Sequence, residues 1–385
     1  MGGAQRHLEQ ISPALIEKGW KISIYCISNV GVLGPGLAKK SVDVIAPPIS
    51  ILSTSFKLLK VLYLILSIAK LFIYLLFRRP AIVHCFLPEA YILGVPLAFI
   101  AGIKHRFMSR RSLNNYQFRQ PMLFKFERHV HRLVTAVLCN SKKIIPQLMH
   151  EGFSVNQIFP IYNGVSIPLA LSPARKDEIR SKLDVSGEAC LLVTTANLIP
   201  YKGHSDLLNA LAQCATDKVA NVDWHLLVIG KDAGILQELI AEAKKLKIER
   251  HVSFVGLRGD AIELMQASDI GVLVSHEEGF SNAVIEGMAC GLPMLVTDVG
   301  GNGEAVIDGE NGYVVAAKDI AAISKGLSGL ISDADTRHQM GRMGQKRADK
   351  YFSVESSVDN YHRFYQSFLS HSGIDKLNTE LHQNS

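Results

Sequence analysis

The sequence predicts an α/β protein of two domains, each built on a parallel sheet with helices on both faces. The chain has 385 residues, more than one typical hydrophobic core accommodates. Short apolar runs alternate with longer helical segments along most of its length, which is the pattern of parallel strands joined by crossover helices. A segment rich in proline and small residues, 165–175, separates two sets of such units and predicts an interdomain linker.

The first set of units predicts an N-terminal domain over 1–167. Strands are expected at 21–28, 42–47, 81–87, 105–111, 136–141 and 157–165, and helices at 4–18, 55–77, 89–101, 121–133 and 141–151. Gly2 and Gly3 follow Met1 directly, so no strand is expected ahead of this glycine-rich segment.

The second set predicts a C-terminal domain over 176–350. Its strands are expected at 190–198, 224–231, 251–257, 269–276, 293–299 and 312–317, and a polar helix at 334–350. A further helix at 351–370 carries aromatic residues on one side, and a frayed polar tail is expected over 371–385.

Composition narrows the function classes. The chain is 48% hydrophobic and 20% charged, which is typical of globular proteins. Its net charge of +6 is uneven, because 104–132 contains many cations and a single acid, Glu127. No nucleic-acid motif accompanies this basic run, so we expect a surface that faces phosphates or anionic lipid rather than a nucleic acid.

Residues 58–77 have the length and apolarity of a membrane span. Lys60, Lys70 and the other polar residues nevertheless fall within one narrow arc of a helix, which favours an amphipathic helix. We expect it to lie partly in the core and partly against an anionic membrane, with 58–79 including Arg78 and Arg79. The alternative, a transmembrane helix, would place 1–57 across the bilayer from the sheet they should join.

The cysteines and histidines show no metal-site spacing. The six cysteines are scattered without a CxxC pair, which predicts free buried thiols in a reducing compartment. His129 and His131 are expected on a solvated helix face. With no signal peptide at the N-terminus, we expect a cytoplasmic protein that is peripheral on the inner face of the plasma membrane.

The segment 276–306 carries two carboxylates, Glu278 and Glu286, eight residues apart around a predicted helix start near Ser281. A helix that begins after a parallel strand directs its free N–H groups toward the crevice where α/β proteins bind ligands. A diphosphate suits that position. Glu286, about one and a half turns along the helix, could accept hydrogen bonds from ribose hydroxyls.

Glu278, Glu286 and the intervening GFSNAVI, with the GLP turn and VGGNGE that follow, resemble the E-x7-E signature of family 4 retaining glycosyltransferases. GGAQRHL, IVHCF, LCNS, IYNGV and ANLIPYKGH occur in the order expected for that family. The resemblance implies the GT-B fold, in which two Rossmann-like domains face each other across a cleft. A C-terminal helix then crosses back to the first domain.

The resemblance also implies roles in the second domain. Glu278 would contact the hydroxyls of the donor sugar, and Glu286 the ribose. Lys202, in the loop PYKGH, would stabilise the leaving diphosphate. Asn197 stands where the family usually has an arginine, so Lys202 and the N–H groups near the helix start would carry more of that stabilisation. The donor-binding residues at this helix start are Gly279, Phe280, Ser281 and Asn282.

In the first domain, Gly2 and Gly3 would let the backbone approach the diphosphate. Arg110 and Arg111 occupy a region where many relatives have a histidine, and they could bind acceptor or donor phosphate, Arg111 being the catalytic candidate. His84 is a further acceptor-side candidate. No side chain stands out as a general base and no acidic pair resembles the DxD metal site of the other large glycosyltransferase fold, so we expect a metal-independent reaction without a cofactor.

These observations predict a retaining transferase that moves a sugar from a nucleotide sugar, expected to be UDP-linked, to a lipid-linked or polysaccharide acceptor. A catalytically weak GT-B partner in polysaccharide assembly and a nucleotide-sugar epimerase remain alternatives. A phosphorylase would need a longer chain with a pyridoxal lysine. A dinucleotide oxidoreductase would need a GxGxxG after a strand.

Overall fold

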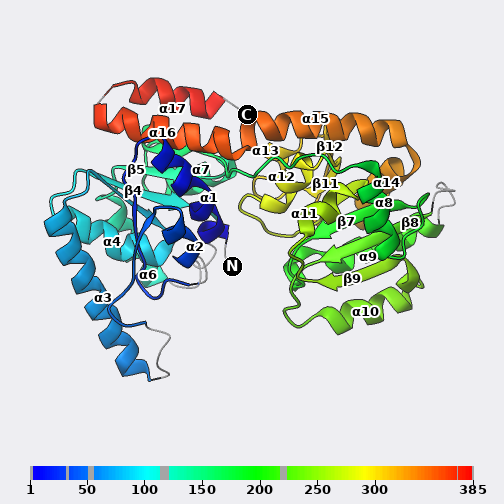
Figure 1. Cartoon of the computed structure of the whole chain (residues 1–385), viewed down its shortest axis with the longest axis horizontal. Coiled ribbons are helices and arrows are strands. Elements are labelled where there is room, and N and C mark those ends of the chain that lie inside the picture. Colours follow the sequence, from blue (N-terminus) through cyan, green and yellow to red (C-terminus); the bar gives the residue numbers. More distant parts are fainter. Residues whose placement is uncertain are drawn as a thin grey trace. The chain divides into compact units, whose positions relative to one another are not determined.

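A computed structural model of the chain describes residues 3–31, 34–50, 56–112, 121–216, 223–370 and 372–383. It divides into two compact units (Figure 1). Unit 1 comprises Met1–Gly164 together with Val354–Ser385, and unit 2 comprises Val165–Ser353. The chain therefore leaves unit 1 just ahead of the expected linker and returns to it with its last helices.

Unit 1 contains a four-stranded parallel sheet in the order β3-β4-β5-β6 and a separate parallel pair, β1-β2. The strands are β1 (Ser23–Tyr25), β2 (Asp43–Ile45), β3 (Ile82–Phe86), β4 (His105–Arg110), β5 (Ala136–Cys139) and β6 (Ile158–Pro160). The helices are α1 (Gly3–Glu17), α2 (Gly34–Lys39), α3 (Lys57–Arg78), α4 (Pro88–Ile100), α6 (Pro121–His131), α7 (Ile145–His150), α16 (Val354–Ser370) and α17 (Ile374–Gln383).

Aromatic residues of helix α16 form part of a hydrophobic core in unit 1. The Phe364 ring lies 4.8 Å from that of Phe107 on β4 and 4.9 Å from that of Phe159 on β6, measured between centroids. The aromatic spacing of the predicted helix at 351–370 therefore marks its buried face.

The prediction of a frayed polar tail was wrong. Residues 374–383 form α17, which buries Leu377 and Leu381, and the Asn378 side-chain amide donates to the Ile158 carbonyl of β6 at 2.8 Å. Two leucines four residues apart give this polar segment a narrow apolar stripe, which is enough to hold one short helix against unit 1.

Unit 2 is a six-stranded parallel sheet in the order β12-β11-β10-β7-β8-β9, and all six strands predicted for this half are present. The strands are β7 (Cys190–Thr195), β8 (Trp224–Ile229), β9 (Val252–Gly256), β10 (Ile270–Leu273), β11 (Met294–Thr297) and β12 (Gly312–Val315). The helices are α8 (Pro173–Lys182), α9 (His204–Thr216), α10 (Leu236–Lys245), α11 (Ala261–Gln266), α12 (Asn282–Ala289), α13 (Asn302–Ala305), α14 (Ile320–Ser332) and α15 (Ala334–Phe352).

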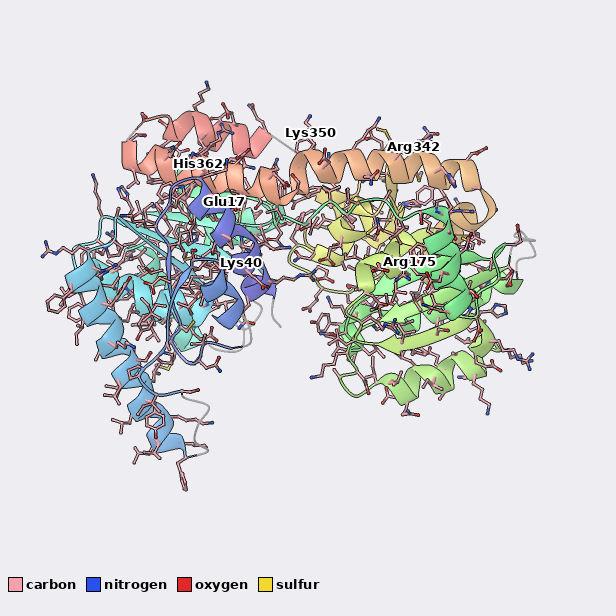
Figure 2. All side chains as sticks on the ribbon, viewed as in Figure 1. Glu17, Lys40, Arg175, Arg342, Lys350 and His362 are labelled. Carbon is pink, nitrogen blue, oxygen red and sulfur yellow. The ribbon has the colours of Figure 1, made fainter. Side chains whose placement is uncertain are left out.

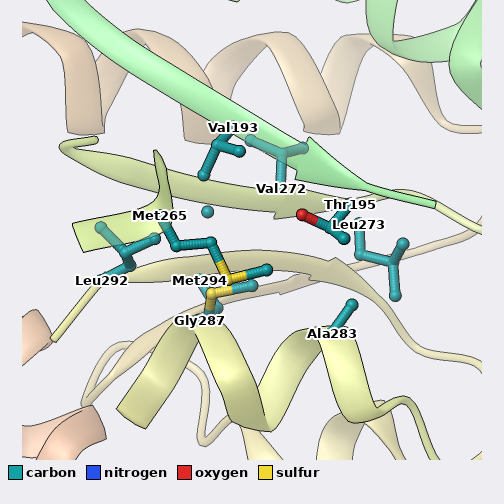
Figure 3. A pocket seen from close by; sticks show the side chains of 10 residues that line it. Val193, Thr195, Met265, Val272, Leu273, Ala283, Gly287, Leu292 and Met294 are labelled. Carbon is teal, nitrogen blue, oxygen red and sulfur yellow. The ribbon is translucent and has the colours of Figure 1, made fainter. Parts of the chain in front are cut away.

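Helix α12 packs closely on this sheet because glycines face the side chain of Met294. A Cβ on Gly287 would lie 2.6 Å from the Met294 sulfur, and one on Gly271 would lie 2.3 Å from it. Figure 3 shows Met294 beside Gly287, with Ala283 further along the same helix. A cavity of only about 10 Å³ remains there, so the position of α12 is fixed by tight packing.

Helix α3 presents its apolar side outward. Ser67 is buried and donates to the Ile27 carbonyl at 2.7 Å, while Lys70 donates to the Ala46 carbonyl at 2.8 Å. The polar arc predicted from the sequence thus faces unit 1. Exposed apolar side chains form a stripe on the other side: Leu58, Leu62, Ile65, Leu66, Ile73, Leu76 and Phe77. Figure 2 shows the outer side chains of α3 pointing away from the strands of unit 1.

By length and composition, α3 could cross a membrane, and only 11% of its most apolar window is buried. Its polar contacts with the loops after β1 and β2 tie one face to unit 1. This arrangement is that of an amphipathic helix attached to a domain by its polar side.

Candidate functional site

In unit 2, Lys202 and Glu278 meet at the point where the strand order of the sheet reverses. Lys202 follows β7 and Glu278 follows β10, the two neighbouring strands from which the chain proceeds in opposite directions. Ligands of open α/β sheets bind beyond the carboxyl ends of such strands. The sheet itself therefore places this pair where a ligand is expected.

The two side chains form a part-buried ion pair. The Lys202 ammonium donates to Glu278 Oε1 at 2.6 Å, and the Ser275 hydroxyl donates to the same oxygen at 2.8 Å. The Lys202 and Glu278 side chains are 17% and 11% exposed. At this depth water screens the charges incompletely, so the pair holds a defined geometry.

Two glycines let the surrounding loops approach each other. Gly203 has a φ of 72°, and a Cβ there would lie 2.0 Å from the Val274 carbonyl oxygen. Gly300 has a φ of 52°, and a Cβ there would lie 2.3 Å from the Glu278 carbonyl oxygen. Both positions require glycine for its backbone conformation and for space. They bring the Lys202 loop and the VGGNGE loop against the segment that carries Glu278.

Helix α12 begins at Asn282 with Ser281 as its N-cap, which confirms the predicted start. Gly291, with a φ of 80°, follows its end. Glu286 lies on this helix and is only 7% exposed, whereas a carboxylate on a helix surface would be open to water. Phe280 packs against Phe352, with 5.5 Å between ring centroids, and anchors the loop that leads into α12.

Burial raises the pKa of the neighbouring Cys290 thiol to about 12, and the Glu286 charge adds to the rise. The thiol therefore stays protonated and carries no charge that would compete with Glu286 for a ligand. All six cysteines are free, and four of them are buried, as expected for unpaired thiols.

Asn197 has a structural environment. Its side-chain oxygen accepts from the Lys231 backbone N–H at 3.3 Å, and its carbonyl accepts from the His204 ring at 3.1 Å. The side chain thus joins the loops after β7 and β8. It follows the carboxyl end of β7, at the position where the resemblance described above implies an arginine.

A second pair near Lys202 was missed from the sequence. His276 Nε2 lies 2.7 Å from Asp206 Oδ2, and the His276 backbone N–H donates to the Tyr201 carbonyl at 2.7 Å. These contacts attach the segment before Glu278 to the Lys202 loop and to α9. The signal available in the sequence was Asp206 in the first turn of a helix directly after PYKGH.

In unit 1, the acceptor-side candidate His84 and the catalytic candidate Arg111 belong to one cluster of polar and aromatic side chains. His84 contacts the Tyr365 hydroxyl at 2.7 Å through Nδ1 and the Ser109 hydroxyl at 2.8 Å through Nε2. Arg111 donates to Asn163 Oδ1 at 2.6 Å. A second histidine of the cluster, His7, was not predicted from the sequence. Its Nε2 lies 3.1 Å from the Tyr361 hydroxyl.

Burial keeps both histidines of this cluster neutral. Burial, with a smaller contribution from the nearby Arg111 charge, lowers the pKa of His84 to about 3. Burial also sets the pKa of His7 well below its ordinary value, with smaller contributions from Arg111 and His84. Arg111 is therefore the charged member of this group, and the histidines serve as neutral hydrogen-bonding groups.

Arg110 differs from the expectation of a phosphate-facing side chain. It is 2% exposed and donates to the two Glu151 oxygens at 3.0 and 2.6 Å, with Glu127 Oε1 3.5 Å away. Strand alternation explains the difference, because neighbouring residues at the end of β4 point to opposite faces. Arg110 closes a buried ion cluster, while Arg111 lies in the polar cluster of unit 1.

His131 also differs from the expectation of a solvated helix face. It is 5% exposed, with its ring nitrogens 3.7 Å from Glu127 and 3.6 Å from Glu151. Among the described residues, Glu127, His131 and Glu151 form the one set whose ligand atoms lie close enough to hold a metal ion. Arg110 already forms ion pairs with both carboxylates, so we interpret the set as a buried ion cluster.

The glycine-rich start of the chain is described in part. Gly2 lies outside the described residues, and Gly3 is the first residue of α1.

Two family models match the chain and together cover most of it. Residues 1–167 match the model described as Glycosyltransferase Family 4, and residues 175–347 match Glycosyl transferases group 1. The junction of the two matches falls at the start of unit 2.

Characterised relatives and a solved structure agree with these matches. The chain is 28% identical over 192 residues to the N-acetyl-alpha-D-glucosaminyl L-malate synthase of Bacillus anthracis, covering 50% of this chain and 49% of that protein. It is 26% identical to the capsular polysaccharide biosynthesis glycosyltransferase CapM of Staphylococcus aureus, covering 77% and 79%. HepE of Anabaena, solved in complex with UDP, superposes with a TM-score of 0.80 at 22% identity, covering 95% and 96%.

The match to the malate synthase thus spans about half of that protein's length, whereas the fold match to HepE spans nearly the whole of both chains. Two Rossmann-like units, the E-x7-E glutamates at the switch point of the second sheet and both family matches lead to one assignment: this chain belongs to the family 4 glycosyltransferases and has the GT-B fold.

Proposed function

We propose that this protein transfers a sugar, with retention of anomeric configuration, from a UDP-sugar to a lipid-linked or polysaccharide acceptor. The observation that carries the proposal is the Lys202–Glu278 pair at the switch point of unit 2. A cation and a carboxylate held together beside the start of α12 provide one group for a diphosphate and one for sugar hydroxyls.

In the proposed reaction, the bond between the sugar C1 and the phosphate oxygen breaks, and the acceptor oxygen bonds to C1 on the same face. The acceptor proton passes to an oxygen of the departing diphosphate. Lys202 stabilises the negative charge that grows on that diphosphate, together with N–H groups at the start of α12. Glu278 orients the sugar, and Glu286 accepts hydrogen bonds from the ribose.

The choice of UDP and of a surface glycan is supported by what the relatives are. HepE was solved with UDP, and CapM is a glycosyltransferase of capsular polysaccharide biosynthesis. The reaction as proposed requires no metal ion, because Lys202 and backbone N–H groups replace one at the diphosphate. Transfer should therefore continue at its full rate in excess EDTA, and loss of activity that Mg²⁺ restores would contradict this part of the proposal.

The donor site is tested by titration calorimetry with UDP. The wild type should bind UDP, whereas Glu286→Ala should bind it at least tenfold more weakly, because the ribose loses a charge-assisted hydrogen-bond acceptor. Lys325→Ala, an exposed lysine on α14, serves as the control and should bind as the wild type does. Equal affinities of the wild type and Glu286→Ala would remove Glu286 from the donor site.

We also infer that unit 1 associates with an anionic membrane on its cytoplasmic side, through 58–79 and the basic run 104–132. Support comes from α3, whose apolar stripe is exposed while its polar arc is bound to unit 1. Residues 113–120 of the basic run lie outside the described residues. A protein held at the membrane would meet a lipid-linked acceptor by diffusion in two dimensions.

Flotation with vesicles tests this association. The triple variant Leu62→Ser, Ile65→Ser, Ile73→Ser removes apolar area from the stripe. With vesicles of the same composition, a smaller fraction of this variant than of the wild type should float. Unchanged flotation of that variant would exclude α3 as the contact.

A further inference from the structure

A groove of about 400 Å³ opens in unit 1 at the C-terminal end of α3. It is lined by the turn after α3, including Arg79, by the turn after α4, including Gly102, and by Lys104 and His105. Leu369 near the end of α16 completes it. Because His105 is the first residue of β4, the groove lies at the amino-terminal edge of the sheet. The polar cluster with Arg111 follows the carboxyl end of the same strand.

The charge of this groove has one sign. Arg79 and Lys104 line it, and none of the described residues lines it with a carboxylate. Arg79 and Lys104 are exposed. Arg79 adopts a left-handed conformation, with a φ of 42°, as the C-cap of α3, and its N–H donates to the Leu75 carbonyl. The Lys104 carbonyl accepts from Arg106 at 3.0 Å and from Thr135 at 3.1 Å, so the backbone on both sides is held in place.

Exposed apolar residues adjoin the lining residues of the groove in the chain, and they are called its rim. Phe77, two residues before Arg79, is 83% exposed, and Ile100, just before the turn after α4, is 66% exposed. Phe99 beside it is 52% exposed. Phe77 also ends the apolar stripe of α3, so the stripe continues to the groove. A one-sign basic groove with an apolar rim suits a ligand with an anionic head and hydrocarbon chains.

We propose that this groove binds the phosphate headgroup of an anionic phospholipid while the rim and the α3 stripe contact its acyl chains. The proposal rests on the membrane association proposed for unit 1 and adds a headgroup site to it. Arg79 and Lys104 hold the phosphate, and His105 lines the base of the groove. The site orients unit 1 on the membrane from the sheet edge opposite Arg111.

The experiment compares flotation of the full chain with vesicles of phosphatidylcholine alone and with vesicles containing about one-third phosphatidylglycerol. The test variant is Arg79→Ala, Lys104→Ala. The matched control is Lys245→Ala, Arg250→Ala, which removes the same charge from exposed positions in unit 2. Both variants should unfold at the same midpoint temperature as the wild type, which checks that each is folded.

The wild type and the control should prefer phosphatidylglycerol vesicles, and the groove variant should lose roughly 30-fold in affinity for them. Its weaker binding to phosphatidylcholine should stay as in the wild type, because the α3 stripe is intact. Competition by glycerol phosphate in solution should be slight, since it lacks acyl chains.

Three results would overturn the headgroup site: equal loss in the control variant, no preference of the wild type for phosphatidylglycerol, or full competition by soluble glycerol phosphate. Failure of the wild type to bind either vesicle would overturn the membrane association as well. The serine variant of α3 separates the two proposals, because it should lose binding to both kinds of vesicle.

Discussion

The Lys202 ammonium lies 2.6 Å from Oε1 of Glu278, a residue 76 positions later in the chain. The pair joins the loops after two neighbouring strands, β7 and β10. Each side chain restrains the other before any ligand arrives, so the site loses little conformational entropy when a donor binds.

Replacing Lys202 by alanine should lower kcat/KM for sugar transfer by about 100-fold or more, because one preorganised donor to the leaving diphosphate is lost. Lys202→Arg should recover part of the rate, since the charge is kept but its geometry changes. Steady-state kinetics with the best nucleotide sugar measure both. Lys325→Ala should behave as the wild type, and a Lys202→Ala rate within about twofold of the wild type would contradict the assigned role.

Glu278 and Glu286 should separate in their kinetic effects. Glu286→Gln should chiefly raise KM for the donor, by roughly tenfold, because ribose contacts are made equally in the ground and transition states. Glu278→Gln should chiefly lower kcat, because it also releases Lys202 from its ion pair. The same pattern in both variants would argue against separate contacts to sugar and ribose.

Gly300→Ala should destabilise unit 2 more than Gly309→Ala does. Both glycines have a positive φ, 52° and 77°, so both substitutions introduce backbone strain. Only at Gly300 would the new Cβ collide, 2.3 Å from the Glu278 carbonyl oxygen, whereas Gly309 has open space. The extra cost should be about 1–3 kcal/mol and should be accompanied by weaker UDP binding. Thermal unfolding and calorimetry of the two variants measure it. Equal destabilisation would contradict the close approach of the two loops.

His84 should make unit 1 less stable in mild acid. Its pKa is about 3 in the folded state and about 6.5 when unfolded, so between these values the unfolded chain binds the extra proton. Stability is therefore fully present above about pH 6.5 and is lost as the pH falls toward 3. From pH 6.5 to 5 the His84 contribution should be about 2 kcal/mol.

Urea unfolding in a Trp224→Phe background isolates this effect, because Trp20 is then the single tryptophan and reports on unit 1. His84→Asn should reduce the loss between pH 6.5 and 5, and His7, whose pKa burial also lowers, should cause the loss that remains. His129→Asn, at an exposed position, should leave the loss unchanged. An unchanged slope in His84→Asn would show that the buried, neutral state of His84 is wrong.

Arg110→Met should destabilise unit 1 by about 3–5 kcal/mol, because it leaves Glu151 and Glu127 buried without their cation. Adding Glu151→Gln should restore part of the loss. The same tryptophan signal measures the unfolding. If Arg110→Met instead left stability unchanged and raised KM for the acceptor, the phosphate-binding role expected from the sequence would be restored.

Much of the fold could be predicted because local patterns repeat. Strand and helix alternation, with a proline-rich break, located the strands of both units and the start of unit 2. The start of α12 at Asn282 was predictable for the same reason, since Ser281 and the preceding turn are local signals. The partners across the sheet were not, because pairs such as His276–Asp206 depend on which strands become neighbours.

The sequence also did not predict the direction in which certain side chains point. The polar arc of α3 was recognised, but its attachment to unit 1 through Ser67 and Lys70 depends on carbonyls far along the chain. Similarly, Arg110 and Arg111 are adjacent and chemically alike. Only the strand to which they belong decides that one enters a buried ion cluster and the other contacts Asn163.

The most direct test of the account is a mass-spectrometric screen for transfer from UDP-, GDP- and ADP-sugars in the presence of membrane extract. The wild type should give a new glycosylated product from a UDP-sugar, and Glu286→Ala and Lys202→Ala should give far less of it under the same conditions. Absence of any product and of UDP binding in the folded wild type, or equal product from Glu286→Ala, would contradict the proposed transfer.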